Sequence, residues 1–193
     1  MKTYHHGNLR QQLIDRGVEL VSSKDSIFSS GEISLRGIAR DLGVSATAVY
    51  HHFPSKEALL ESIVIHLFQE LLSTWEGKDG FELGQSYVGF FLDHPGVLHI
   101  MFGPTTGMST RVQELQAQAF EVLTKALSDL PTEDQEPMAL LFWVLAHGIV
   151  SLTLSGSLGV DPQSCPGVSP LFYQSPGELL KKFEPYLRKG MGE

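Results

Sequence analysis

Residues 34–56 read SLRGIARDLGVSATAVYHHFPSK, and this stretch decides the fold of the N-terminal part of the chain. Apolar residues recur at helical spacing in its first half: Leu35, Ile38, Ala39 and Leu42. Gly43 follows at the point where the chain needs a left-handed turn, which glycine enters most cheaply. Ser45 then provides an N-cap for a second helix, whose inner side carries Val49 and Phe53. The stretch therefore predicts two short helices joined by a tight turn.

The second of these helices leaves one side facing outward. That side carries Ser45, Ala46, Thr47, Tyr50 and His51. A helix-turn-helix of this kind lays its second helix in the major groove of DNA, with the N-terminal residues toward the base edges. Any small three-helix domain can also use a glycine-terminated helical hairpin, so the spacing alone leaves both interpretations open.

The rest of the chain has helical periodicity and almost no strand pattern, which predicts an all-α protein. Asn8 and Ser55 are expected to cap two further helices, the second running to about Trp75. Later helices are expected over residues 81–93, 96–102, 110–130, 136–158 and 176–189. The acidic segment PTEDQEP, residues 131–137, is expected to be a break, and residues 160–175 a loop rich in Pro, Gly and Ser.

The composition excludes several classes of protein. A single cysteine, Cys165, rules out an intrachain disulfide and a cysteine-based zinc cluster. The first ten residues lack the apolar segment of a secretory signal, and no run of 18 uninterrupted apolar residues predicts a membrane span. The nearest candidate, residues 138–154, contains His147 and Gly148 and suits a buried helix better. We therefore expect a cytoplasmic protein that does not enter the membrane.

The charge of the chain is unevenly distributed. The net charge is −8, but residues 1–60 carry seven Lys and Arg against six Asp and Glu. The acidity therefore belongs to the later part of the chain, where it lowers non-specific attraction to phosphate. The small positive surplus near the N-terminus implies that base contacts and dimerisation must supply much of any affinity for DNA.

Several motifs carry a resemblance to a known family. The segments ISLRGIA, DLGVS and AVYHHFPSKEALL, between residues 33 and 60, resemble the N-terminal domain of TetR-family transcriptional regulators. The opening YHHGNLRQQLI, from residue 4, is similar to the first helix of one branch of that family. The segment WVLAHG, from residue 143, resembles the sensor domain of the same branch, which is named WHG for its Trp and His-Gly positions. The resemblance implies a helix-turn-helix DNA-binding domain over residues 1–56, joined by a long helix to a helical ligand-binding and dimerisation domain over residues 57–193.

The resemblance also implies a sequence-specific regulator that represses transcription, responds to a small-molecule effector and binds a palindromic operator as a homodimer. The candidate DNA-binding residues are Tyr4, Arg36, Ser45, Ala46, Thr47, Tyr50, His51 and Lys56. The methyl groups of Ala46 and Thr47 suit contact with a thymine methyl. The second helix has no Arg or Lys, so Arg36 is the better candidate for a base or phosphate. Tyr50 and His51 match family positions that hold phosphates, and Lys56 begins a helix whose free N–H groups favour a phosphate.

Alternatives remain for some of these positions. Tyr50 is also explained by packing, and His52 is better explained by packing than by DNA contact because it lies on the inner side of its helix. The arm that carries Tyr4 is as well explained by a frayed terminus.

The family resemblance implies a ligand pocket in the C-terminal part. Its candidate residues are Phe91, Met101, Phe102, Phe120, Trp143 and His147. Trp143 and His147 are four residues apart and share a helix face, and His147 is the candidate for a polar contact. A hydrogen-bonded core histidine explains His147 equally well, and Phe and Met fill the cores of most helical proteins.

The expected dimer face is formed by the helices over residues 136–158 and 176–189. The first of them has more apolar residues than one buried stripe needs, although a single protomer's core is the alternative explanation. The sequence indicates no catalytic residue, metal site or cofactor, because phosphate-binding loops, nucleophile elbows and metal-spaced histidines are missing from it. The rival hypotheses are a helical ligand-binding or scaffold module without DNA binding and, with least support, a helical enzyme.

Overall fold

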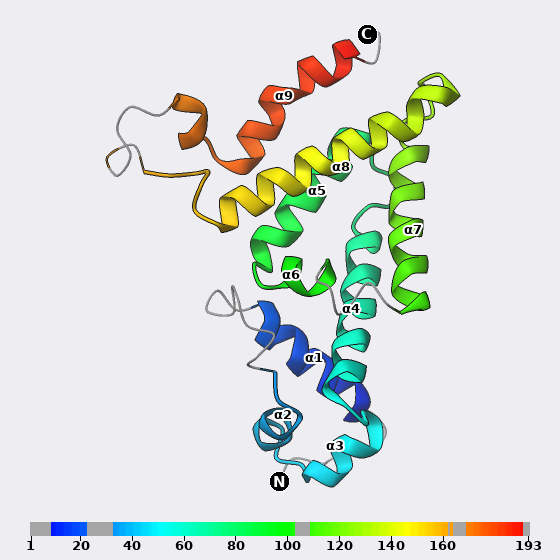
Figure 1. Cartoon of the computed structure of the whole chain (residues 1–193), viewed down its shortest axis with the longest axis vertical. Coiled ribbons are helices and arrows are strands. Elements are labelled where there is room, and N and C mark those ends of the chain that lie inside the picture. Colours follow the sequence, from blue (N-terminus) through cyan, green and yellow to red (C-terminus); the bar gives the residue numbers. More distant parts are fainter. Residues whose placement is uncertain (1–8, 23–32, 103–108, 162, 164–168, 191–193) are drawn as a thin grey trace. The chain divides into compact units, whose positions relative to one another are not determined.

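The computed structural model describes residues 9–22, 33–102, 109–161, 163 and 169–190. All regular structure in these residues is helical, which confirms the all-α prediction (Figure 1). The helices are α1 (Leu9–Ser22), α2 (Leu35–Asp41), α3 (Ala46–His52), α4 (Lys56–Ser73), α5 (Gly80–Asp93), α6 (Val97–Met101), α7 (Thr110–Lys125), α8 (Thr132–Leu154), the 3-10 helix η2 (Pro170–Tyr173) and α9 (Pro176–Gly190).

The chain folds into two compact units. The first comprises Met1–Glu70 and His94–Leu115, and the second comprises Leu71–Asp93 and Gln116–Glu193. The boundary between the units falls inside α4 and again inside α7, so each of these helices contributes to both. The functional division predicted at residue 56 stays a prediction, because these units are defined by packing alone.

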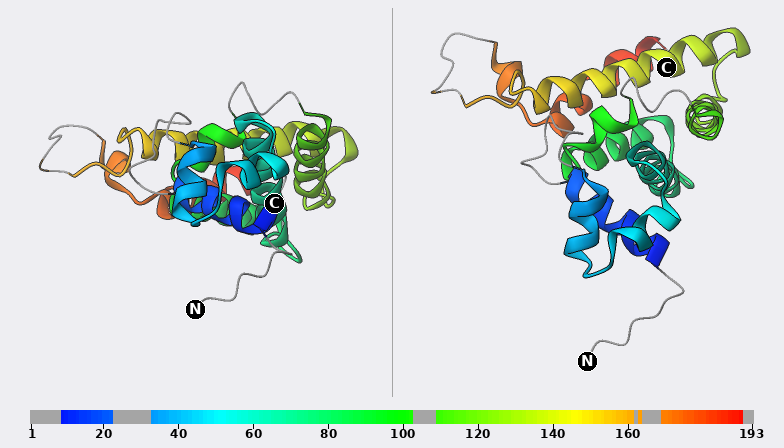
Figure 2. Two further views of the ribbon diagram at one scale, coloured as in Figure 1. Left: turned by 90° about the horizontal axis from the view of Figure 1, so that it is seen from below. Right: turned by 60° about the horizontal axis from the view of Figure 1, so that its bottom comes forward.

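The first unit is built around α1, which contacts α2, α3 and α6 (Figure 2). Gly17 of α1 faces α4 so closely that a Cβ atom there would overlap the Cδ1 atom of Ile63. Arg16 connects α1 to α2, because its guanidinium donates to the Asp41 carboxylate at 2.9 Å. Leu13 of α1 has no exposed surface. These contacts hold α2 and α3 on a buried apolar base.

The second unit is built around α5, α8 and α9, which contact one another in all three pairings (Figure 1). Its apolar core comes from all three helices: Phe91 of α5, Val150 of α8 and Leu180 of α9 are at most 1% exposed.

Helix α8 differs from the prediction at both ends. It begins at Thr132, so the predicted break at residues 131–137 is wrong and Pro137 lies within the helix. The acidic residues of its first turn, Glu133 and Asp134, are favoured there by the helix dipole. It ends at Leu154 because Gly156 has a φ of 73° and the N–H of Ser157 donates to the Leu152 carbonyl at 2.8 Å. This is a Schellman motif, which stops the helix before the predicted end at residue 158.

Two other predicted ends also move. Helix α7 ends at Lys125 rather than at residue 130, because the chain then tightens into i→i+3 hydrogen bonds, such as that from the Leu127 N–H to the Thr124 carbonyl. Helix α4 ends at Ser73 and continues as a turn to Gly77, whose φ is 73°. The remaining predicted helices, including the first helix from Leu9, lie within two residues of their predicted bounds.

One side of α8 carries large apolar residues that its own protomer leaves open. Leu140, Leu141, Val144 and Leu152 are 48–54% exposed. By length and composition alone, α8 is the one described helix apolar enough to cross a membrane, with a mean hydropathy of 1.8 over 18 residues and 28% of that window buried. A single helix of this kind is weak evidence for a span, because exposed apolar helix faces also mark contacts with other proteins.

Candidate nucleic-acid interface and sensor core

Two side-chain caps and one left-handed glycine fix the helix-turn-helix formed by α2 and α3. The Ser34 hydroxyl accepts from the Gly37 N–H and caps α2, and the Ser45 hydroxyl accepts from the Ala48 N–H at 3.1 Å and caps α3. Gly43 adopts the left-handed conformation, with a φ of 67°. This geometry sets the direction in which α3 leaves α2.

The inner side of α3 is sealed by apolar packing. Val49 has no exposed surface and Phe53 is 2% exposed, while Ile38 and Ala39 of α2 are equally buried beside them. Arg10 of α1 lies over the Phe53 ring at 5.0 Å from its centroid, and it also donates to the Ser62 hydroxyl. The orientation of α3 is therefore fixed by a dry core on one side.

The outer side of α3 presents Thr47, Tyr50 and His51, all of which are exposed, and Tyr50 has 44% of its surface open. Ala46 is half-buried, and the exposed Ser45 uses its hydroxyl as the helix cap. Arg36 on α2 is also exposed. These side chains form what we call the α3 surface: Arg36, Ser45, Ala46, Thr47, Tyr50 and His51.

Two other predicted positions differ from this group. His52 is half-buried and packs edge-on against the His51 ring at 5.7 Å between centroids. Tyr4 and the rest of the N-terminal arm lie outside the described residues.

The start of α4 already has an anionic partner. Lys56 is half-buried there, and the Ser55 hydroxyl accepts from the Ala58 N–H. The Glu57 carboxylate accepts from its own backbone N–H and from the Ser55 hydroxyl, which holds its pKa below the usual value, and the charge of Lys56 adds to this effect. The Glu57 carboxylate therefore competes with a phosphate for the N–H groups at this helix start.

The predicted ligand-binding residues fall into both units. Met101 is fully buried in the first unit, where the Phe102 ring packs edge-on against Phe68 at 6.0 Å. Phe91, Phe120, Trp143 and His147 belong to the second unit. Phe120 on α7 is half-buried.

Tyr87 of α5 brings three of these residues together. Its hydroxyl lies 2.8 Å from the His147 Nδ1 atom, its ring lies 4.7 Å from the Phe91 ring, and Trp143 hydrogen-bonds to its hydroxyl. An indole can only donate, so the Tyr87 oxygen accepts from Trp143 and its own O–H donates to His147. The resulting order, Trp143 to Tyr87 to His147, assigns the His147 proton to Nε2.

Burial shifts the pKa values of this cluster in the direction of neutral groups. It raises the pKa of the Tyr87 hydroxyl, which the hydrogen bond from Trp143 partly offsets, and it lowers the pKa of His147. The cluster is therefore a neutral polar network inside an apolar unit. The sequence did not predict a role for Tyr87, because a tyrosine within an apolar helix looks the same as any core residue.

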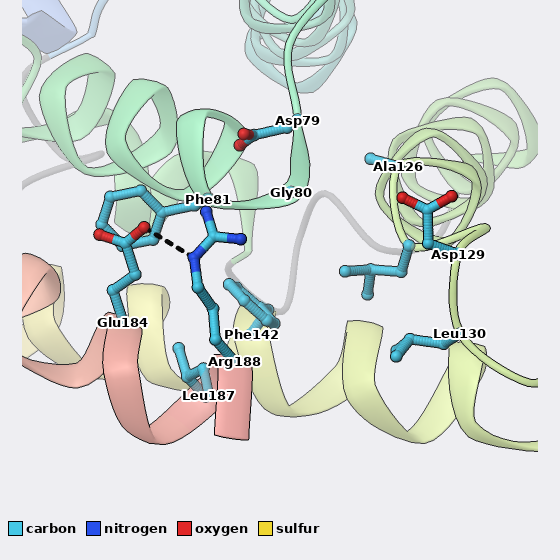
Figure 3. Close-up of a pocket in the computed structure, with 11 residues that line it drawn as sticks. Asp79, Gly80, Phe81, Ala126, Asp129, Leu130, Phe142, Glu184, Leu187 and Arg188 are labelled. Carbon is cyan, nitrogen blue, oxygen red and sulfur yellow. Dashed lines mark hydrogen bonds and ion pairs between the residues drawn. The ribbon is translucent and has the colours of Figure 1, made fainter. Parts of the chain in front are cut away.

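Two cavities are lined by described residues of the second unit. The larger has a volume of about 150 Å³ and is drawn in Figure 3, with Phe81, Leu130, Phe142 and Leu187 among its lining residues. The smaller has a volume of about 20 Å³ and is lined by Trp75, Tyr87, Phe142 and Trp143, among others. Phe120 lines neither of these two cavities. Among the described residues, no group of three or more His, Cys, Asp or Glu side chains has the arrangement of a metal site.

Two family models match the chain. Residues 31–63 match the model described as bacterial regulatory proteins, tetR family, which includes the turn and the α3 surface. Residues 81–166 match the model described as tetracyclin repressor-like, C-terminal domain. The second range contains Tyr87, Trp143 and His147.

Individual proteins are similar over most of the chain. The HTH-type transcriptional regulator Mb1846 of Mycobacterium bovis is 22% identical over 205 residues, which cover 82% of this chain and 88% of the relative. The nucleoid occlusion factor SlmA of Vibrio cholerae is 25% identical over 136 residues, which cover 65% of this chain and 68% of the relative. The structure of a protein of unknown function from Rhodococcus sp. RHA1 has the same fold, with a TM-score of 0.75, 23% identity and full coverage of both chains.

Proposed function

The chain belongs to the TetR family of DNA-binding transcriptional regulators, and on this premise we propose that it is a cytoplasmic repressor that binds a palindromic operator as a homodimer and leaves it when a small-molecule effector binds. The observation that carries the proposal is the α3 surface. One side of α3 is sealed against the core, and the opposite side offers exposed Thr47, Tyr50 and His51 from a helix whose direction is fixed by its turn.

The chemistry of the α3 surface supports DNA reading by short side chains. The N-terminal end of a recognition helix approaches base edges, and the methyl group of Thr47 suits a thymine methyl. Tyr50 and His51, one turn further along, suit phosphate contacts. Arg36 adds the positive charge that α3 lacks, and it is the group best suited to a guanine or a phosphate.

A homodimer is supported by the open apolar side of α8. Leu140, Leu141, Val144 and Leu152 are exposed in the protomer, and Gly148 lies among them. A Cβ atom on Gly148 would meet nothing within 4 Å in its own protomer, so the protomer itself does not require glycine at this position. A second copy that packs its α8 and α9 on this side would bury these residues and would place two α3 helices at two half-sites.

Effector binding is supported by the Tyr87 network and the two cavities of the second unit. Because α4 and α7 each contribute to both units, a ligand that shifts either helix has a direct mechanical route to the first unit. A coupling of a few kcal/mol is enough to change operator occupancy.

The test begins with selection of binding sites from random duplex DNA by the full chain, followed by footprinting of the selected site. We expect a palindrome with half-sites about one helical turn apart. The double variant Thr47→Ala/Tyr50→Ala should bind this site about a hundredfold more weakly, because it loses contacts worth roughly 1–3 kcal/mol each. Gln118→Ala, an exposed α7 position, is the control and should bind normally.

The rival hypothesis is a helical ligand-binding module that has lost DNA binding. It predicts that selection returns no preferred site, and that any retention on DNA disappears at moderate salt without a footprint. Unchanged operator binding by the double variant would show that α3 is not the reading helix.

A further inference from the structure

The two cavities of the second unit follow one another along the same three helices. On α5, Gly80 and Phe81 line the larger cavity, while Leu83 and Gly84, one turn later, line the smaller one. At the end of α7, Leu123 lines the smaller cavity, and Ala126 and Leu127, in the turns that follow the helix, line the larger one. We call the larger the outer chamber and the smaller the inner chamber.

Phe142 of α8 lines both chambers. It is 4% exposed and is drawn among the residues that line the outer chamber in Figure 3. Because Phe142 lines both chambers, a change of its rotamer would alter the wall that they share. A volume of about 150 Å³ in the outer chamber is enough for a molecule the size of benzene, whereas about 20 Å³ in the inner chamber holds one water.

The charged lining of the outer chamber is acidic, with Asp79, Asp129 and Glu184 against Arg188, and we call the Asp79 and Asp129 carboxylates its mouth. Glu184 and Arg188 form an ion pair at 2.9 Å, which leaves the carboxylates of Asp79 and Asp129 to set the charge (Figure 3). Neither aspartate forms an ion pair with another residue in the described part of the chain. Asp79 is held in place because it accepts from the Glu82 N–H at 2.8 Å, while Glu82 accepts from the Asp79 N–H. A fixed negative mouth attracts cations and repels anions.

The inner chamber is aromatic. Trp75, Tyr87, Phe142 and Trp143 all line it. Trp75 is 6% exposed, and its Nε1 atom is buried without a hydrogen-bond partner. Electron-rich indole and phenol rings attract cations, most strongly where water is excluded. The mouth therefore favours a cation because of its carboxylates, and the inner chamber favours a cation because of its aromatic rings.

From this geometry we infer that the effector of the proposed function is a small organic cation, that it enters past Asp79 and Asp129, and that Phe142 gives way to let it reach the indole rings. The claim that this cation acts as the effector rests on the proposed function, whereas the claim that a cation binds in these chambers does not. Phe142 acts as a gate, and the Trp75, Tyr87 and Trp143 rings receive the cation.

The sequence supplies its own reporter for this site, because both tryptophans of the chain line the inner chamber. The full chain is titrated with tetramethylammonium chloride while its tryptophan emission is followed, with sodium chloride at equal ionic strength as the blank. The neutral isostere tert-butanol is titrated in parallel. We expect saturable change with tetramethylammonium and none with tert-butanol at the same concentrations. Equal responses to both would overturn the assignment of a cation.

Variants test the path. Asp129→Asn should weaken tetramethylammonium binding about fivefold at low salt, as expected for one charge near the mouth, while Glu133→Gln outside the cavity leaves it unchanged. Phe142→Ala should at least double the quenching of tryptophan emission by acrylamide, and the milder Phe142→Leu should raise it less if the alanine variant unfolds. Quenching that is the same in folded Phe142→Leu and in the parent chain would overturn the role of Phe142 as a gate.

The same titration with operator DNA present separates this inference from the proposed function. Tetramethylammonium binding without DNA release supports the cation site and contradicts the proposed effector response. DNA release by another compound that leaves tryptophan emission unchanged supports the proposed function and overturns the placement of the effector in these chambers.

Discussion

Replacement of Gly148 by alanine is expected to stabilise the protomer and weaken the dimer, two effects of opposite sign from one methyl group. Gly148 lies on the side of α8 that carries the exposed Leu141, Val144 and Leu152, which stand seven residues before it, four before it and four after it. Within the protomer an added Cβ atom meets nothing within 4 Å. Alanine is the better helix former by about 1 kcal/mol, so the protomer should gain roughly that free energy of unfolding.

In a symmetric dimer the same methyl group appears twice between closely approaching helices. Overpacking at such a contact costs about 1–3 kcal/mol, so two methyl groups should cost about 3 kcal/mol in dimer free energy. This corresponds to a rise of roughly a hundredfold in the dimer Kd. A substitution that disrupts the core of the protomer would lower both the free energy of unfolding of the protomer and the stability of the dimer. A gain in the first together with a loss in the second therefore identifies the interface.

Sedimentation equilibrium over a dilution series measures the dimer Kd, and urea unfolding at concentrations below that Kd measures the protomer. Gly89→Ala is the matched control. Gly89 also lies in a helix of the second unit, and a Cβ atom there also meets nothing within 4 Å. The control should show the same gain in protomer stability with an unchanged Kd. An unchanged or lower Kd for Gly148→Ala would refute the assignment of this side of α8 to the interface.

Three shorter predictions follow from the fold. Ser45→Ala removes the acceptor for the Ala48 N–H and should cost about 1 kcal/mol in urea unfolding, with weaker operator binding because α3 has only seven residues; full operator affinity would contradict the need for this cap. Gly17→Val forces a side chain against Ile63 and should cost about 2 kcal/mol in the same assay, whereas a neutral result would mean that α1 and α4 have room to separate. Burial lowers the pKa of His147, so the unfolded chain binds more protons than the folded chain, and the free energy of unfolding should fall as the pH drops below about 6.5. His147→Gln should flatten this pH dependence between about pH 7 and 5. Parallel pH profiles for the variant and the parent chain would show that His147 does not contribute.

The helix-turn-helix could be predicted well from the sequence because its helix caps and its turn glycine act locally. Ser34, Gly43 and Ser45 each act within a few residues of their own position, and each makes the predicted cap or turn. The ends of α7 and α8 were less predictable. Pro137 looks like a helix breaker in sequence, yet it lies in the second turn of α8, where the acidic first turn already favours helix.

The aromatic and histidine cluster around Tyr87 could be predicted only in part. Trp143 and His147 share a helix face, and this spacing is visible in the sequence. Their common partner Tyr87 lies 60 residues before His147, and no local pattern connects the two. Trp75 is similarly hidden at the end of a long apolar helix, and its place beside Tyr87 depends on tertiary packing. The family resemblance places Met101 and Phe102 in the same pocket as these residues, but both pack in the first unit.

The chain passes from one unit to the other three times, after residues 70, 93 and 115. This connectivity limits how domains of such a protein can be exchanged in a chimera. The Nδ1 atom of His94, the first residue after α5, lies 2.9 Å from the Ser22 hydroxyl of α1, so the first unit, which carries the α3 surface, is completed by residues that follow a segment of the second unit. A chimera that joins residues 1–56 to a foreign sensor would discard α6 and most of α4. Exchange of specificities between relatives should therefore transplant surface side chains onto the intact scaffold rather than splice whole modules.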